Sequence, residues 1–351
     1  MQTIEVSAEH RYNVVVGCNW QIELPRYMEG RARVAIIVSS AMRTHIQDIE
    51  SADSQVHIFD IPDGEDGKDA ATLESLWDRF GSAGLTRTDL VIAIGGGATT
   101  DIAGFAAATW LRGIDWLAIP TTLAGMVDAA IGGKTGMNSK YGKNLIGAFH
   151  SPTGVLIDTT WLETLSDRDF VAGLAEVVKC GFIADENILE LLSGKSLSEV
   201  RNSQQMTEEL ILRSVKIKAD VVSTDFKEGF AREILNYGHT MGHAVELHSH
   251  YQLRHGEAVA IGMVYAAELA HLQGILPAEL VALHRSLLSG LGLPTTYPAT
   301  ALPQLLPLLS MDKKARGNSL RFVAISGVGR TLRLEGITQG DLQIAYERVA
   351  S

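Results

Sequence analysis

Residues 34–157 alternate short apolar, mostly β-branched runs with stretches of helical spacing. The runs predict buried strands over residues 34–38, 56–61, 90–94, 116–119 and 155–157. Residues 73–80 have helical spacing, and the glycines that follow residue 94 open another helix. Strands that alternate with helices favour parallel βαβ units, in which helices cover both faces of one sheet. The first half of the chain is therefore predicted to be an α/β domain.

The pattern changes near residue 167. Helical spacing predicts helices over residues 170–192, 206–222, 234–248, 255–272 and 277–291, and strand signals return only near residues 320–325. A chain of 351 residues is also long for one hydrophobic core. We therefore predict two domains, residues 1–165 and residues 166–351, of which the second is mostly helical. The boundary is expected between Asp158 and Asp169.

Charge and cysteine content narrow the classes of function. The net charge of −11 argues against a nucleic-acid partner, although a local lysine cluster still suits a small anion. Two distant cysteines, Cys18 and Cys180, indicate no disulfide framework. We find no apolar run typical of a membrane span and no secretory signal. The expectation is a cytoplasmic protein that binds neither nucleic acid nor membrane.

A glycine-rich segment follows the third predicted strand. Gly95, Gly96 and Gly97 stand between that strand and a helix that includes Asp101. Glycines at a helix N-terminus let backbone N–H groups approach a phosphate, but the segment lacks the GxGxxG pattern. A plain tight turn is an equal alternative. The later GGKT sequence is no P-loop, because Asp128 stands where that motif needs its first glycine.

Histidines cluster in the second half, where five of 11 lie between residues 239 and 255. By spacing alone, His239 and His243 are the pair that would share a metal ion, since they are one helical turn apart. Glu176 and Lys179 also share a helix face within an apolar segment, so this charged pair needs a partner or a function. Satisfied structural histidines and a surface ion pair are the alternative interpretation.

Basic residues are spread over several segments. Lys134 and Lys143 lie in a glycine-rich stretch with Asn138 and Asn144, and Lys216, Lys218, Arg232 and residues 312–316 add positive charge later. An anion pocket for phosphate and carboxylate is one interpretation, and solvated helix faces are the other.

Taken together, eight segments resemble the 3-dehydroquinate synthase family of the sugar phosphate cyclases. They are DGEDGK (63–68), GGGATTD (95–101), RGIDWLAIPTTLAGMVDAAIGGKTGMN (112–138), GKNLIGAFHSP (142–152), GLAEVVKCGF (173–182), REILNYGHTMGHAVE (232–246), HGEAVAIGM (255–263) and MDKKARGNSLRFV (311–323). The resemblance covers residues 60–325. It implies a Rossmann-like NAD-binding first domain and a mostly α-helical second domain that binds metal and substrate.

The resemblance also implies site residues. Zinc or cobalt would be held by Glu176, His239 and His255. NAD contacts fall on Asp63, Glu65, Lys68, Gly97, Ala98, Thr99, Thr100, Asp101, Thr121, Thr122, Lys134, Lys143, Trp161, Leu162, Glu163 and Thr164. Substrate and catalytic contacts fall on Asp128, Lys134, Asn144, Lys179, Lys218, Arg232, Asn236 and His243, and on Lys313 or Lys314. The metal set replaces the pair favoured by spacing, so His243 becomes a substrate residue.

The implied activity is conversion of 3-deoxy-D-arabino-heptulosonate 7-phosphate to 3-dehydroquinate and phosphate, a phosphorus–oxygen lyase reaction of the shikimate pathway. NAD would oxidise the substrate transiently, phosphate would leave, and reduction and an intramolecular aldol step would follow. Asp128 and His243 are the expected proton-handling groups, and the enzyme is expected to be a homodimer. Alternatives are a sibling cyclase, a metal-dependent alcohol or glycerol dehydrogenase, and a non-catalytic binding protein.

Two positions depart from the family pattern. Ser39 and Ser40 end the first predicted strand where many relatives have an acidic residue, which puts one ribose contact in doubt. Ala124 and Gly125 replace a bulkier pair after PTTL, which we interpret as a packing change.

Overall fold

The computed structural model describes residues 1–46, 49–227, 229, 231–315 and 320–351, and of residues 310–315 it describes the backbone alone. Contacts divide the chain into two compact units. The first unit comprises Met1–Leu165 with Lys218–Lys227, and the second comprises Ser166–Ile217 with Glu228–Ser351. The division falls within one helix, α8 (Gln204–Thr224), whose last turns belong to the first unit.

The first unit is built on a seven-stranded sheet of order β1-β2-β9-β6-β5-β3-β4. Its strands are β1 (Gln2–Ser7), β2 (Arg11–Val16), β3 (Arg33–Ser39), β4 (Gln55–Ile61), β5 (Leu90–Gly95), β6 (Asp115–Pro120) and β9 (Gly154–Ile157). The β1–β2 pair is antiparallel, and the other neighbours are parallel. The five strands predicted from apolar runs are confirmed, and the N-terminal hairpin β1–β2 was not anticipated.

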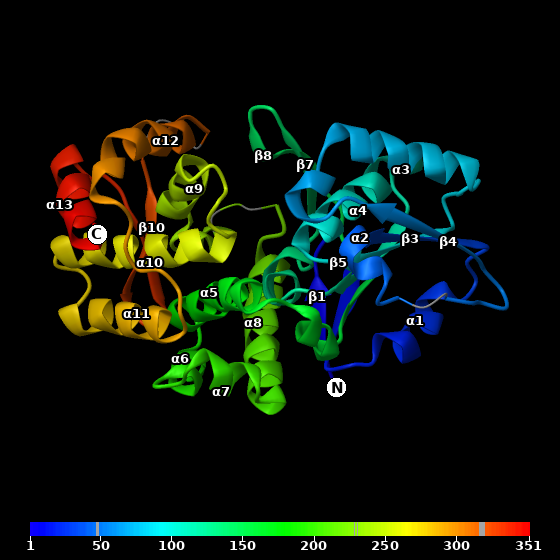
Figure 1. Cartoon of the computed structure of the whole chain (residues 1–351), viewed down its shortest axis with the longest axis horizontal. Helices are drawn as coiled ribbons and strands as arrows, with labels where there is room; N and C mark the ends of the chain where they lie inside the picture. Colours follow the sequence, from blue (N-terminus) through cyan, green and yellow to red (C-terminus); the bar gives the residue numbers. More distant parts are fainter. Residues whose placement is uncertain (47–48, 228, 230, 316–319) are drawn as a thin grey trace. The chain divides into compact units, whose positions relative to one another are not determined.

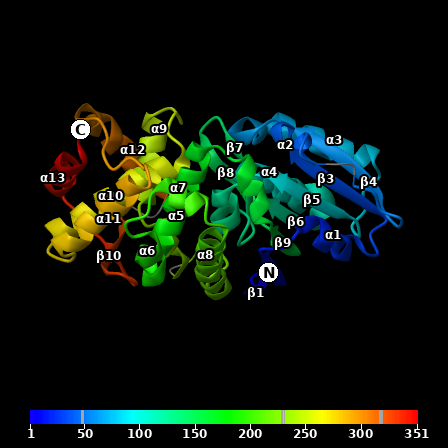
Figure 2. The same cartoon turned by 60° about the horizontal axis from the view of Figure 1, so that its bottom comes forward.

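Helices cover both faces of this sheet, as the uninterrupted burial of β5 requires. They are α1 (Trp20–Met28), α2 (Ser40–Arg43), α3 (Ala70–Ser82) and α4 (Gly97–Thr109), with short turns η1 (Gly64–Gly67), η2 (Trp110–Arg112), η3 (Gly125–Ala129) and η4 (Thr159–Thr164). Helices α3 and α1 lie on opposite sides of the sheet (Figures 1 and 2). The predicted α/β class of the first half is confirmed.

A separate hairpin projects from the first unit. Strands β7 (Lys134–Ser139) and β8 (Gly142–Phe149) pair only with each other. No residue of β8 is buried, so the strand has no apolar face that a sequence pattern would show. The pairing depends on small residues, since a Cβ on Gly147 would lie 2.2 Å from the Thr135 carbonyl oxygen.

The second unit is mostly helical, as predicted. Its elements are α5 (Asp167–Ile183), α6 (Glu186–Leu192), α7 (Leu197–Arg201), most of α8, η5 (Ala231–Asn236), α9 (His239–His248), α10 (His255–Leu272), α11 (Ala278–Gly290), η6 (Ala299–Ala301), α12 (Leu302–Ala315), α13 (Gln339–Val349) and the hairpin β10 (Phe322–Gly327) with β11 (Arg330–Leu334). Helix α10 is buried along almost its whole length and forms the centre of this unit.

Two predicted helices in this unit have wrong bounds, and one strand was missed. The helix predicted over residues 170–192 is two helices, because α5 ends at Ile183 and Asp185 caps the start of α6. The helix predicted over residues 234–248 begins only at His239, since Gly238 has a left-handed φ of 81° that no helix interior adopts. Strand β11 was missed, although it pairs with the predicted strand near residue 322.

Helices α9 and α10 approach closely at Gly262. A Cβ there would lie 1.9 Å from the Gly238 carbonyl oxygen. We expect Gly262→Ala to lower the free energy of unfolding by about 3 kcal/mol, because backbone atoms on both sides must move. Denaturant unfolding measures this. Gly290→Ala is the control, since nothing lies within 4 Å of its Cβ position, and a similar loss in both variants would contradict the packing argument.

Among the described residues, no helix is long and apolar enough to cross a bilayer.

Candidate active site

Helix α5 supplies a buried carboxylate and a buried ammonium to the second unit. Glu176 is 1% exposed and Lys179 is 2% exposed, and the three-residue spacing places both on one face. Lys179 donates to Glu176 Oε2. The other oxygen, Oε1, is buried and accepts no hydrogen bond from the residues that the structure describes. An unsatisfied buried carboxylate oxygen calls for a positive partner.

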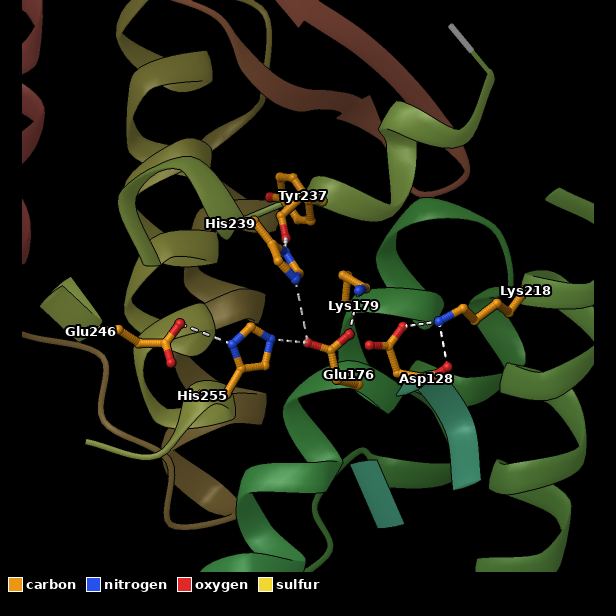
Figure 3. Close-up of polar contacts among 8 residues, drawn as sticks. All are labelled: Asp128, Glu176, Lys179, Lys218, Tyr237, His239, Glu246 and His255. Atoms are coloured by element: carbon orange, nitrogen blue, oxygen red, sulfur yellow. Dashed lines mark hydrogen bonds and ion pairs between the residues drawn. The ribbon is translucent and has the colours of Figure 1, made fainter. Parts of the chain in front are cut away.

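Two imidazoles face that oxygen from the N-terminal residues of α9 and α10. His239 Nε2 lies 3.7 Å from Glu176 Oε1, and His255 Nε2 lies 3.3 Å from it (Figure 3). Ligand atoms of the three residues lie within 4.8 Å of one another. One carboxylate oxygen and two imidazole nitrogens are a donor set that suits zinc or cobalt. The residues present therefore fit a divalent metal ion.

The charges around this cluster shift its pKa values. Burial alone would raise the pKa of Glu176, but Lys179 and the two imidazoles hold it well below its usual range. Burial, reinforced by the charge of Lys179, lowers the pKa of His239. Burial also acts to lower the pKa of His255, yet the carboxylates of Glu176 and Glu246 raise it to about 10. Metal binding at His255 therefore requires release of its proton.

Backbone carbonyl acceptors determine the tautomers of two buried histidines, His284 and His239. His284 Nδ1 lies 2.6 Å from the Leu280 carbonyl oxygen and donates to it, so its Nε2 accepts from the Tyr237 hydroxyl at 2.8 Å. The carbonyl oxygen of Tyr237 lies 3.2 Å from His239 Nδ1 and accepts its proton. His239 Nε2 is then bare and faces Glu176, as a metal ligand must be.

His284 gives a testable pH dependence of stability. It is fully buried, and burial lowers its pKa to about 4. Below pH 6.5, His284 binds a proton in the unfolded chain but not in the folded chain. The free energy of unfolding therefore falls as the pH drops toward 4, and the loss is complete below pH 4. The full loss is about 3 kcal/mol. Denaturant unfolding between pH 7 and pH 4 should show this component in the wild type and not in His284→Gln. An identical pH profile in both would contradict it.

The first unit presents the start of α4 directly after β5. Gly96 is its N-cap and, having no side chain, cannot cap the N–H groups of the first turn. A Cβ on Gly95 would lie 2.5 Å from Thr99 Oγ1, which explains the glycine there. The Gly95 carbonyl oxygen accepts from Thr121 N after β6. The loop therefore has the form of an anion site.

A polar network ties this helix to η1 and the β7–β8 hairpin. Lys68 is 2% exposed and donates to Asp101 at 2.6 Å and to Asn144 at 2.5 Å. Asn144 has a left-handed φ of 57°. Glu65 accepts from Asn138 at 2.5 Å and lies 3.8 Å from Lys143. Burial raises the pKa of Asp101, and the charge of Lys68 opposes this effect. The network joins predicted NAD residues to a predicted substrate residue.

Asp128 and Lys218 form a second pair in the first unit. Lys218, 6% exposed, donates to both the carboxylate and the carbonyl oxygen of Asp128 (Figure 3). Contacts of Ser7 with Ser223 and of Phe149 with Phe226 hold the same segment of α8 and its continuation against this unit.

The other predicted residues occupy varied settings. Lys134 is exposed at the start of β7, and Asp63 accepts from Ala41 N. In η4, Trp161 and Leu162 are buried, and Trp161 stacks on Trp20, whereas Glu163 and Thr164 are exposed. In the second unit, Arg232 is buried and Asn236 is half-buried in η5, and His243 is exposed on α9. The side chains of Lys313 and Lys314 lie outside the described residues.

Comparison with known proteins decides the family. The 3-dehydroquinate synthase N-terminal model matches residues 58–172, and the C-terminal model of the same family matches residues 173–315. The chain belongs to the 3-dehydroquinate synthase family. It is 48% identical to the 3-dehydroquinate synthase of Mycolicibacterium vanbaalenii over 99% of this chain and 98% of that protein. It is also 48% identical to that of Thermobifida fusca, over 97% and 94%.

Solved structures of sibling cyclases share the fold. A 2-epi-5-epi-valiolone synthase from Streptomyces hygroscopicus with NAD⁺ and Zn²⁺ has a TM-score of 0.88 at 28% identity, over 99% of this chain and 98% of its own. A 2-deoxy-scyllo-inosose synthase with carbaglucose-6-phosphate, NAD⁺ and Co²⁺ has 0.86 at 27%, over 99% and 100%. A probable glycerol dehydrogenase from Sinorhizobium meliloti, at 14% identity and 0.66, shares the fold alone.

The structure also brings forward residues that sequence reasoning passed over. Glu246 lies 3.0 Å from His255 Nδ1, and sequence analysis assigns it no role. Its position seven residues after His239, two turns along one helix face, was the available signal. Tyr237 and His284 gave no such signal, because their contact joins residues 47 positions apart.

Proposed function

We propose that Glu176, His239 and His255 hold the divalent metal ion of a 3-dehydroquinate synthase, and that the α4 loop with its neighbours holds NAD. Family membership gives the activity: conversion of 3-deoxy-D-arabino-heptulosonate 7-phosphate to 3-dehydroquinate and phosphate. The substrate is a phosphorylated sugar-like compound, and the cofactors are NAD and Zn²⁺ or Co²⁺. The observation that carries the metal assignment is Glu176 Oε1, which is buried, accepts no hydrogen bond from any described residue and faces two imidazoles.

Each cofactor supplies one kind of chemistry when bound. The metal ion held by Glu176, His239 and His255 would polarise a substrate oxygen and stabilise negative charge on it. NAD would supply reversible hydride transfer, with no net production of NADH. Both depend on how the surrounding side chains hold the substrate.

The chain's own residues hold charge and move protons. Lys179 neutralises one oxygen of Glu176, which leaves the other for the metal. Lys134, Asn144, Lys179 and Arg232 are proposed to bind the substrate's phosphate and carboxylate. Asp128, paired with Lys218, is proposed to handle protons, as is the exposed His243. The network of Lys68 and Asp101 supports the NAD loop and orients Asn144.

The test is phosphate release from 3-deoxy-D-arabino-heptulosonate 7-phosphate with NAD⁺ and Zn²⁺ or Co²⁺, while absorbance follows NADH. We expect phosphate without net NADH, loss of activity after chelation, and a product with the mass of 3-dehydroquinate. Release from sedoheptulose 7-phosphate instead would place the chain among the sibling cyclases. A homodimer, a cytoplasmic location and the absence of nucleic-acid or membrane partners stay predictions.

A further inference from the structure

Glu246 is a buried acid that the proposed function does not use. It lies on α9, is 5% exposed, and places Oε2 3.0 Å from His255 Nδ1 (Figure 3). A buried carboxylate is costly unless it is paired. Its partner here is an imidazole whose opposite nitrogen faces Glu176.

This contact determines which nitrogen of His255 is available. A carboxylate accepts, so Nδ1 must carry the proton, and Nε2 is then the nitrogen whose lone pair can bind a metal ion. Nε2 lies 3.3 Å from the unsatisfied Glu176 Oε1. The orientation of the ring thus follows from Glu246.

The two imidazoles are oriented by different acceptors. Nδ1 of His239 faces the Tyr237 carbonyl oxygen, whereas Nδ1 of His255 faces a carboxylate. An anionic acceptor makes the imidazole a stronger electron donor than a carbonyl does. His255 is also the more exposed of the two rings, so its geometry depends more on this one contact.

The main chain of Glu246 also holds the turn that leads to His255. Its carbonyl oxygen accepts from Tyr251 N at 2.9 Å and from Ser249 Oγ at 3.0 Å. These bonds close the short turn between α9 and α10, in which His250 and Tyr251 have left-handed φ values of 49° and 59°. Since α10 begins at His255, Glu246 contacts the ring of His255 through its carboxylate and the preceding turn through its carbonyl oxygen.

Glu246 could instead be a metal ligand, because His243, Glu246 and His255 also have ligand atoms within 4.8 Å of one another. Such a site would take Nδ1 of His255, the nitrogen that already faces the carboxylate, and would add the exposed His243. It would leave Glu176 Oε1 unsatisfied. The Glu176 group accounts for the orphan oxygen and for the Nε2 atoms of both imidazoles, which face it at 3.7 and 3.3 Å, so the observations favour it.

We infer that Glu246 is a positioning residue that sets the tautomer and orientation of His255 for the metal ion held by Glu176, His239 and His255. The inference rests on the proposed metal site and adds a residue to it. Removing such an orienting group typically weakens metal binding by about 10- to 100-fold.

The experiment measures Co²⁺ and Zn²⁺ affinity of the full chain by competition with a chelator. We expect Glu246→Gln to raise the dissociation constant by about 10- to 100-fold, and to shift the visible absorption of bound Co²⁺. Activity should return at saturating metal, because all three ligands are present. Glu268→Gln is the matched control: Glu268 is an equally buried acid on α10 that pairs with Arg285 and Arg348 and not with a ligand. Its metal affinity should stay within about twofold of the wild type.

The possible outcomes distinguish a failure of the positioning role of Glu246 from a failure of the proposed metal site. Wild-type affinity in Glu246→Gln, or an equal loss in both glutamine variants at matched melting temperatures, overturns the positioning role. Activity that saturating metal does not restore would make Glu246 a ligand and overturn it too. Wild-type affinity in Glu176→Gln would instead refute the proposed metal site itself.

Discussion

Glu176→Gln is expected to remove metal binding and to lower kcat by at least about a thousandfold, or about 4 kcal/mol in activation free energy. Glutamine keeps the shape of the side chain but is a neutral, weak metal ligand. Its amide would also leave two neighbouring imidazoles without the charge that they face at 3.3 and 3.7 Å. The loss should persist at high metal concentration, unlike that expected for Glu246→Gln.

The same substitution removes the buried carboxylate to which Lys179 donates, which costs about 3–5 kcal/mol in stability. A fall in activity alone would therefore be ambiguous. The double variant Glu176→Gln, Lys179→Met removes the buried ammonium together with the carboxylate that it faces, and we expect it to recover most of the stability while metal binding stays absent. Metal content by atomic spectroscopy and the melting temperature measure the two effects. Metal retained in a stable double variant would show that Glu176 is no ligand.

The core of the first unit was readable from sequence because its strands are buried on both faces. Strand β5 has six buried residues in succession, which appear as one apolar run. The same reasoning fails for β8, none of whose residues is buried, and for β1, where only Val6 is buried. These strands are held by backbone hydrogen bonds to a partner strand, and such bonds leave no apolar pattern in the sequence.

The metal cluster shows the same limit. Helical spacing places His239 and His243 together, and their rings are indeed 5.3 Å apart. Yet His239 shares its cluster with Glu176 and His255, which lie on other helices. Because α9 and α10 are joined by a turn and packed through Gly262, His255 returns to the start of α9. The family resemblance identified Glu176 and His255 as the partners of His239, since local periodicity contains no information on tertiary packing.

Lys68 illustrates a third limit, the burial of charged side chains. In the sequence it lies in a polar turn, where a solvated lysine is the usual outcome. In the structure it is 2% exposed and bonded to Asp101 and Asn144, which are 33 and 76 positions away. Burial of that ammonium depends on partners from two other segments, so only the assembled unit shows that the lysine is buried.

The Asp128–Lys218 pair gives the second large effect. We expect Lys218→Met and Asp128→Asn each to lower kcat/KM by about 30- to 1,000-fold, or about 2–4 kcal/mol in activation free energy, because the buried lysine holds an acid that is proposed to handle protons. Lys218 binds both the side chain and the carbonyl oxygen of Asp128, so its loss also frees the π-helical turn η3 that carries the acid. Steady-state kinetics with the heptulosonate phosphate measure both variants.

A double-mutant cycle tests whether the two residues act as one unit. If Lys218 serves mainly to hold Asp128, the variant that lacks both should be no slower than the slower single variant, because the second substitution removes a group already misplaced. Multiplied losses would instead mean that each residue contacts the substrate independently. Lys216→Met is the control on the same helix, since Lys216 is exposed, and its kcat/KM should stay within about twofold of the wild type. A similar loss in Lys216→Met would attribute the effect to the overall charge of α8. It would contradict a specific role of the Asp128–Lys218 pair in the reaction.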